Sequence, residues 1–264
     1  MAGLRRGDLV EVKSPAEILS TLDATGALDG LPFMPEMVAL CGKRFTVERR
    51  AERVCDTVHY SGTRRLADAV FLEQERCNGK GHGRCQAECR ILWKEAWLRG
   101  ADAGGPEAGP FPAEETEPLM ARATAGARTR RDGEERWRCQ ATDLPACTEH
   151  VKLWDPRGYL RELSSGNVGM AHFARVMSRA VVREPMRKLG MIDEIHVRGS
   201  AQKGDSFPAL GLQPGERVRV KSREEIAKTL NEQGRNKGLW FDEEMLAYCG
   251  REFRVRQRVR TFIN

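Results

Sequence analysis

The chain contains the same segment twice. Residues 7–50 align without a gap to residues 215–258, at a constant offset of 208, and 21 of the 44 aligned positions are identical. Identity near one half over an ungapped stretch is far above what unrelated segments show, so the pattern indicates a duplication. The chain must therefore accommodate two related folding units and the segments that lie between and after them.

Each copy carries the same succession of local signals. Short apolar runs at residues 9–12 and 218–220 are typical of strands. Ser14 and Ser222 are each followed three residues later by a glutamate, which is the capping-box spacing that starts a helix. A second short helix then ends at a Cys-Gly pair, and a Phe-x-Val motif begins a return strand. We expect an α+β fold with two repeated small modules, each fitting an SH3-like barrel with a helical insertion, around a helical middle region.

The prediction divides the chain into four segments. They are the first repeat module with a Cys-rich extension (1–100), a mostly disordered linker (101–136), a Cys-bearing helical middle region (137–198) and the second repeat module (199–264). The linker prediction rests on residues 101–119, which hold four prolines, three glycines and five acidic residues but no basic residue. No cysteine-bearing extension follows the second copy, so we expect that copy to be truncated.

Two helices are predicted in the middle region. Asp155 and Pro156 are typical of an N-cap and first helical position, and they predict a helix that ends before Gly166. Residues 168–189 predict a second helix. We also expect a helix over residues 89–99, on which Trp93 and Trp97 would share one face because they are four positions apart.

The eight cysteines need an explanation. The N-terminus lacks an apolar signal segment, and no apolar run approaches the roughly 20 residues of a membrane helix. We therefore expect a cytoplasmic protein without membrane contact. Disulfides are rare in that compartment, which leaves metal ligands, buried packing residues or reactive thiols.

The segment from Cys77 to Cys89 is the strongest candidate for a metal site. Three cysteines and one histidine fall within thirteen residues, and the glycines between them allow the loop to fold back so that ligands converge. Thiolate sulfur and imidazole nitrogen suit zinc, and thiolates also suit an iron–sulfur cluster, so the metal stays open between these two. The candidate ligands are Cys55, Cys77, His82, Cys85 and Cys89. The alternatives are buried structural thiols and a catalytic or redox thiol.

The other cysteines are less informative. Cys139 and Cys147 repeat the Cys-x7-Cys spacing of Cys77 and Cys85, with His150 close behind, and the role of these three residues stays open. Cys41 and Cys249 occupy equivalent positions of the two copies, and we expect both to pack beneath a helix end.

The charge pattern offers a weaker signal. The formal net charge is +6, and basic residues gather at residues 43–65, 120–138 and 251–260. A basic face can attract nucleic acid, but an ordinary solvated surface explains the same pattern, and aromatic residues for base stacking are few at 6%. Nucleic acid is therefore a possible but not a favoured partner.

Several motifs resemble an uncharacterised family of bacterial proteins. They are LDGLPFMPEM at residues 28–37, CDT at 55–57, HGxCQxxCxxxWKEAWL at 82–98 and CQATDLP at 139–145. The resemblance covers most of the chain but implies no activity. In that family a second Cys- and Trp-containing tail follows the second repeat, which agrees with the expected truncation.

The sequence thus favours a metal-binding protein with a structural or interaction role, for which a protein partner is possible. Two alternatives remain at this stage: a metal- or cluster-dependent enzyme of unknown substrate, and a nucleic-acid-binding protein. The chain contains no phosphate-binding loop, nucleophile elbow or HExxH motif that would select an enzyme class.

Overall fold

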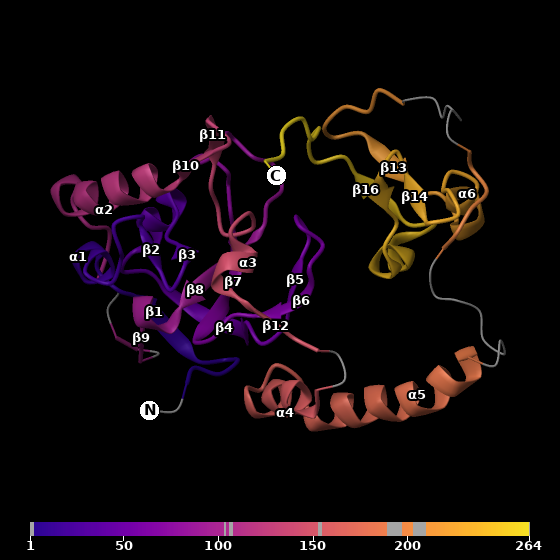
Figure 1. Ribbon diagram of the computed structural model, residues 1–264, viewed down its shortest axis with the longest axis horizontal. Helices are drawn as coiled ribbons and strands as arrows, with labels where there is room; N and C mark the ends of the chain where they lie inside the picture. Colours follow the sequence, from indigo (N-terminus) through magenta and orange to yellow (C-terminus); the bar gives the residue numbers. More distant parts are fainter. Residues whose placement is uncertain are drawn as a thin grey trace. The chain divides into compact units, whose positions relative to one another are not determined.

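The computed structural model describes residues 3–102, 104–105, 108–152, 155–188, 197–202 and 210–263, with the side chains of residue 131 and of residues 180–188 left out. The chain divides into two compact units, which we describe separately. The first unit consists of Met1–Phe173 with Arg260–Asn264, and the second is Ala174–Val259. Helices and strands are both present, so the α+β class is correct (Figure 1).

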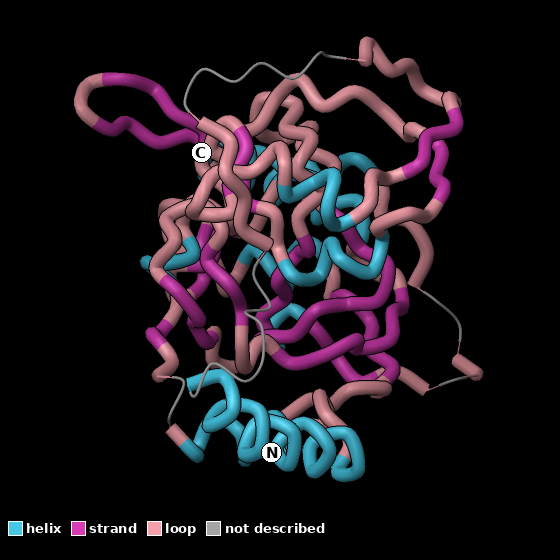
Figure 2. The backbone as a smooth tube through the Cα atoms, turned by 90° about the vertical axis from the view of Figure 1, so that its right-hand side faces the viewer, coloured by secondary structure: helices cyan, strands magenta, loops and turns pink. Residues whose placement is uncertain are grey.

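A five-stranded antiparallel sheet forms the centre of the first unit, in the order β8-β7-β4-β1-β9. Its strands are β1 (Leu9–Val12), β4 (Arg44–Arg50), β7 (Ala69–Arg76), β8 (Arg90–Lys94) and β9 (Leu98–Gly100). The two edge strands, β8 and β9, are joined only by the 3-10 turn η2 (Glu95–Trp97). This connection spans at most about 14 Å, whereas a flat five-stranded sheet is about 19 Å wide. The sheet must therefore curl into a half-barrel, as the curved strands in Figure 2 show.

The segment between β1 and β4 has the predicted order of elements. It contains α1 (Pro15–Leu19), the paired strands β2 (Ala27–Leu28) and β3 (Leu31–Pro32), and the 3-10 helix η1 (Pro35–Leu40). The capping box at Ser14 is confirmed. The Ser14 side chain accepts a hydrogen bond from the backbone N–H of Glu17, and the Glu17 side chain accepts one from the backbone N–H of Ser14. These short helices are held against the core by buried side chains, Ile18 from α1 and Met37 from η1, and Phe33 just before η1 is buried with them.

The predicted helix over residues 89–99 is wrong. Residues 90–94 form strand β8, which pairs with β7, and the 3-10 turn η2 and strand β9 follow. A short apolar run fits a buried strand and a buried helix equally well, and here pairing with β7 decides. Trp93 and Trp97 nevertheless converge, since both rings meet Phe33 edge-on at centroid distances of 6.3 and 5.1 Å.

The structure also differs from the mostly disordered linker expected over residues 101–136. These residues contain helix α2 (Ala113–Gly126) and most of a hairpin of β10 (Arg128–Arg131) and β11 (Glu134–Trp137). Helix α2 is ordered because Leu119 and Ala123 are buried in the same core as η1 and α1. Its acidic and proline-rich composition concealed this narrow apolar stripe.

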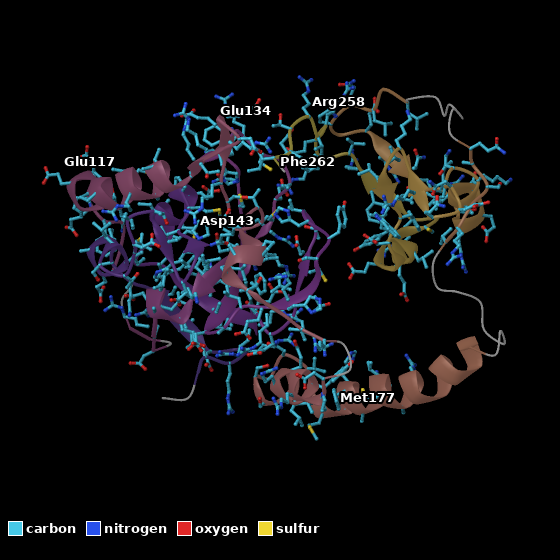
Figure 3. All side chains as sticks on the ribbon, viewed as in Figure 1. Glu117, Glu134, Asp143, Met177, Arg258 and Phe262 are labelled. Carbon is cyan, nitrogen blue, oxygen red and sulfur yellow. The ribbon has the colours of Figure 1, made fainter. Side chains whose placement is uncertain are left out.

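The rest of the first unit packs beside the sheet. A small sheet has the order β12-β6-β5, with β5 (Val54–Asp56), β6 (Gly62–Arg65) and β12 (Glu149–His150). The short helix α3 (Leu144–Cys147) comes directly before β12 in the chain. Helix α4 (Pro156–Ser164) begins as predicted, because the side chain of Asp155 accepts from the backbone of Arg157. Helix α5 (Met170–Lys188) follows and crosses the boundary between the units. Side chains fill the space between these elements (Figure 3).

The second unit repeats an order of elements seen in the first. It has β13 (Arg217–Arg219), α6 (Arg223–Ala227), β14 (Arg235–Asn236), β15 (Leu239–Trp240), η3 (Glu243–Tyr248) and β16 (Glu252–Arg254). Each begins 208 residues after its counterpart among β1, α1, β2, β3, η1 and β4. The predicted capping box at Ser222 is confirmed, but β13 and β16 form a sheet of only two strands.

Within the residues that the structure describes, none of the helices combines the length and apolarity that crossing a membrane requires.

Candidate metal centre

The cysteine loop is closed by the β7–β8 pairing. Arg76 at the end of β7 lies opposite Arg90 at the start of β8, and residues 77–89 form the connection. The backbone N–H of Cys77 donates to the carbonyl oxygen of Cys89 at 2.8 Å. The first and last cysteines of the loop therefore face each other where it leaves the sheet.

Three glycines allow this loop to pack closely against its surroundings. A Cβ atom on Gly79 would lie 2.0 Å from the carbonyl oxygen of Cys85, and Gly79 has a φ of +65°. A Cβ on Gly81 would lie 2.6 Å from Oε2 of Glu36, and one on Gly83 would lie 2.6 Å from Nε1 of Trp137. The glycines thus let the loop contact itself, η1 and β11, which agrees with the predicted fold-back.

Glu36, Cys77 and His82 come together inside this loop. The Cys77 sulfur lies 3.0 Å from Oε1 of Glu36 and 3.4 Å from Nε2 of His82. Nδ1 of His82 lies 3.3 Å from Oε1 of Glu36, and one ligand atom from each of the three residues lies within 4.8 Å of the others. The side chains of Glu36 and His82 are each only 2% exposed.

Two polar atoms of this group lack hydrogen-bond partners. Oε2 of Glu36 and Nδ1 of His82 are buried, and neither makes a hydrogen bond of acceptable geometry, despite the close approach of Nδ1 to the other carboxylate oxygen. Burying a polar atom without a partner costs about 1–3 kcal/mol. The arrangement is therefore incomplete as a hydrogen-bonded network.

The electrostatics favour a neutral thiol at Cys77 and a neutral imidazole at His82 when no cation is present. Burial raises the pKa of the Cys77 thiol, and the hydrogen bond and charge of Glu36 raise that pKa further. Burial lowers the pKa of His82, although Glu36 opposes this shift. A bound cation would reverse the preference at Cys77, because it stabilises the thiolate.

Three further thiols are linked to Cys77 electrostatically, through Cys89. Cys85 and Cys139 are buried, and Cys89 is partly buried. The pKa of Cys89 is raised first by burial and then by the charges of Cys139 and Cys85, and Cys89 in turn acts on the pKa of Cys77. Four thiols (Cys77, Cys85, Cys89 and Cys139) therefore interact electrostatically, and we call them the four-thiol cluster.

Gln140 places Cys139 in this cluster. Its buried side chain accepts from the backbone N–H of Leu92 at 2.8 Å and donates to the carbonyl oxygens of Leu92 at 2.9 Å and Pro32 at 3.1 Å. Arg138, on the other side of Cys139, pairs with Asp143, which is labelled in Figure 3. These anchors bring a cysteine from a distant part of the sequence to strand β8.

The predicted ligands are distributed unevenly. Cys77 and His82 contact each other, and Cys85 and Cys89 belong with Cys77 to the four-thiol cluster. Cys55 is exposed on β5 opposite Thr63, and the structure does not bring it into the group. Sequence reasoning missed Glu36, because nothing in the cysteine spacing points to a carboxylate of the repeat module. Cys139 carried one signal, the spacing that it shares with Cys77.

The remaining cysteines and His150 lie elsewhere. Cys41 lies in the core of the first unit, which agrees with its expected packing role. Burial there raises the pKa of its thiol to about 12. Burial raises the pKa of Cys147 to about 11, and the backbone of Gly30 packs against this residue. Cys249 is partly exposed, and His150 is exposed on β12. None of the eight cysteines forms a disulfide in the described chain.

This donor set is suited to metal binding. Carboxylate oxygen, thiolate sulfur and imidazole nitrogen are the three ligand types that zinc takes in proteins. Four thiolates also suit an iron–sulfur cluster. Among the residues that the structure describes, Glu36, Cys77 and His82 are the one group of three close metal-ligating side chains.

Comparison with known proteins provides no further constraint. No protein-family model matches the chain, and no curated protein and no solved structure matches it.

Proposed function

We propose that the protein binds a zinc ion at Glu36, Cys77 and His82. The observation that carries this proposal is the pair of unpartnered buried atoms, Oε2 of Glu36 and Nδ1 of His82, beside the Cys77 sulfur. Buried polar groups are normally paired, and a divalent cation is one partner that satisfies a carboxylate, an imidazole and a thiolate together.

Cys89 is the fourth ligand that the arrangement favours. Its backbone carbonyl oxygen accepts a hydrogen bond from the backbone N–H of Cys77, and its charge raises the Cys77 pKa. A zinc ion with four protein ligands is structural, and the burial of Glu36 and His82 supports such a role more than an open catalytic position. The ion would connect η1 of the repeat module to the cysteine loop.

An iron–sulfur cluster is the second candidate. The supporting observation is that Cys77, Cys85, Cys89 and Cys139 all interact electrostatically, although no three of these sulfurs are as close together as the Glu36–Cys77–His82 group. A cluster with several iron and sulfide atoms holds its four thiolates farther apart than a single zinc ion does. The four-thiol cluster would then be the ligand set.

Metal analysis of the full-length protein tests both candidates. We expect about one zinc per chain and no visible absorbance after anaerobic purification, and we expect zinc to be lost in Cys77→Ser and His82→Ala. Cys147→Ser is the matched control, because this cysteine lies outside the cluster, and it should retain zinc. Stoichiometric iron and sulfide with a brown colour would support the cluster instead. Protein without either metal would contradict both proposals.

The order of elements supports a proposal about the architecture. We infer that residues 9–50 and 217–254 are copies of one SH3-like module, because their six elements start at a constant offset and both copies have a capping box. The eight free thiols also agree with a reducing, cytoplasmic location.

Nucleic-acid binding receives less support from the first unit. Arg44, Arg50 and Arg65 of the basic segment 43–65 are paired with carboxylates. Side chains held in this way are not free to contact phosphates, so a structural role explains them better.

A further inference from the structure

Three arginines of the first unit hold buried N–H groups that have no acceptor. Arg49 lies on β4, Arg53 lies between β4 and β5, and Arg161 lies on α4. Nε of each residue and Nη2 of Arg53 are buried without a hydrogen-bond partner in the described chain. Buried donors are normally paired, so these three residues, which we call the arginine group, offer hydrogen bonds that the described protein does not use.

Helix α4 brings the arginine group together. A Cβ atom on Gly158 would lie 3.3 Å from Nη2 of Arg53. Gly158, Arg161 and Glu162 share one face of the helix, because they are spaced i, i+3 and i+4. Oε1 of Glu162 lies 3.8 Å from Nη2 of Arg49. All three guanidinium groups therefore lie along this face of α4.

The arginine group is short of negative charge. Arg53 makes no ion pair with a described residue, and its guanidinium carbon lies 4.2 Å from the centre of the Tyr159 ring. The carboxylates nearest to Arg49 and Arg161 are 3.8 and 3.7 Å away, which is too far for a hydrogen bond. Sheltered charges are normally paired, so an anion would complete the arrangement.

The arginine group is not shared by the two copies of the repeat. At the offset of 208 that relates the copies, Gln257 corresponds to Arg49 and Thr261 corresponds to Arg53. These positions can therefore carry smaller or neutral side chains after a return strand of the same type. The two arginines are a feature of the first unit alone.

We propose that the arginine group binds hydrogen phosphate, either free or as a phosphate monoester. Guanidinium groups match phosphate oxygens with paired N–H donors, which supplies the missing acceptors and charge together. Oε1 of Glu162 is buried and also has no hydrogen-bond partner, and the P–OH group of hydrogen phosphate can donate to it. The Arg49 and Arg161 side chains are each 38% exposed, so the ligand can enter from solvent.

A nucleic-acid backbone is a poorer occupant of this site. The carboxylates beside the arginine group, Glu52 and Glu162, are only 6% and 7% exposed and would oppose a long polyanion. The phosphodiester of a nucleic acid also has no proton to donate to Glu162. The chemistry fits one protonated phosphate group, and it involves none of the residues of the metal centre.

Calorimetric titration of the full-length protein tests the site. At neutral pH and constant ionic strength in chloride, we expect saturable binding of inorganic phosphate. Sulfate should bind at least about tenfold more weakly, because it has no proton for Glu162. Glycerol 3-phosphate distinguishes the two sources of the ligand. Tighter binding than that of inorganic phosphate would indicate a monoester, and weaker binding would indicate free phosphate.

Variants with the residues of the second copy separate binding from misfolding. Arg53→Thr and Arg49→Gln should each weaken phosphate binding by about tenfold or more, since charged hydrogen bonds are lost. Arg136→Thr on β11 is the matched control for loss of one positive charge, and it should bind normally. Glu162→Gln should reduce the preference for phosphate over sulfate. Phosphate should raise the Tm of the parent protein and of Arg136→Thr but not that of Arg49→Gln.

Three results would overturn the proposal. They are no saturable binding up to roughly 10 mM phosphate, equal affinities for phosphate and sulfate, and unchanged phosphate binding in both Arg53→Thr and Arg49→Gln. Zinc content is measured on the same samples. Phosphate binding by protein that holds no zinc would contradict the metal proposal alone, so the two proposals fail separately.

Discussion

The Cys77 thiol donates to Oε1 of Glu36 at 3.0 Å and so joins two residues that are 41 positions apart. Glu36 belongs to the 3-10 helix of the repeat module, and Cys77 begins the loop that follows β7. This contact connects the duplicated part of the chain to the cysteine extension.

Replacement of Glu36 tests this connection. We expect Glu36→Ala to reduce zinc affinity by about tenfold or more, because one ligand is removed while the thiols remain. Competition with a chromophoric chelator measures the change. Glu244→Ala is the matched control, since Glu244 is the equivalent residue of the second unit and is exposed. Equal affinities for the two variants would show that Glu36 is not a ligand.

The cysteine loop should not tolerate a side chain at Gly79. The φ of +65° and the 2.0 Å approach to Cys85 lead us to expect that Gly79→Ala lowers the free energy of unfolding by about 3 kcal/mol and impairs metal binding. Chemical denaturation measures the first effect. Gly100→Ala serves as the comparison, since a Cβ there would have no atom within 4 Å, and it should be nearly neutral.

Gln140 should be important for stability as well as for the position of Cys139. We expect Gln140→Leu to lower the free energy of unfolding by about 2–4 kcal/mol, because the Leu92 N–H and two carbonyl oxygens lose their buried partner. Urea denaturation of the metal-free protein isolates this effect from ligand loss. A change in the free energy of unfolding below about 0.5 kcal/mol would show that other groups form these backbone hydrogen bonds when Gln140 is replaced.

Alkaline pH should destabilise the protein through Cys41. Burial raises the pKa of this thiol from 9.0 to about 12, so the folded state keeps a proton that the unfolded state loses above pH 9. The stabilisation is complete below pH 9 and declines as pH rises towards 12, by about 1.4 kcal/mol per pH unit.

Comparison of Cys41→Ala with the parent protein measures this contribution. The free energy of unfolding of the variant should fall less steeply between pH 9 and pH 10.5. Cys55→Ala, which removes an exposed thiol, should keep the slope of the parent. Parallel profiles for all three proteins would contradict the assignment.

The sequence correctly predicted the helix starts that depend on residues close together in the chain. The serine and glutamate of each capping box lie three residues apart, and Asp155 and Pro156 are adjacent, so short-range hydrogen bonds and a restricted φ decide those helix starts. The helix predicted over residues 89–99 failed because its apolar run fits either structure, and strand pairing with β7 is a long-range interaction.

The sequence by itself determined that one segment recurs 208 positions later and that a glycine-rich stretch carries Cys77, His82, Cys85 and Cys89. Only the tertiary structure decided that Glu36 and Cys139 approach that loop and that Cys55 does not. It also decided that Leu31 and Met37 are buried in the first unit, whereas the identical residues Leu239 and Met245 of the second unit are exposed. The physical reason is that ligand convergence and burial depend on which strands pair, and such pairing joins residues that are far apart in the chain.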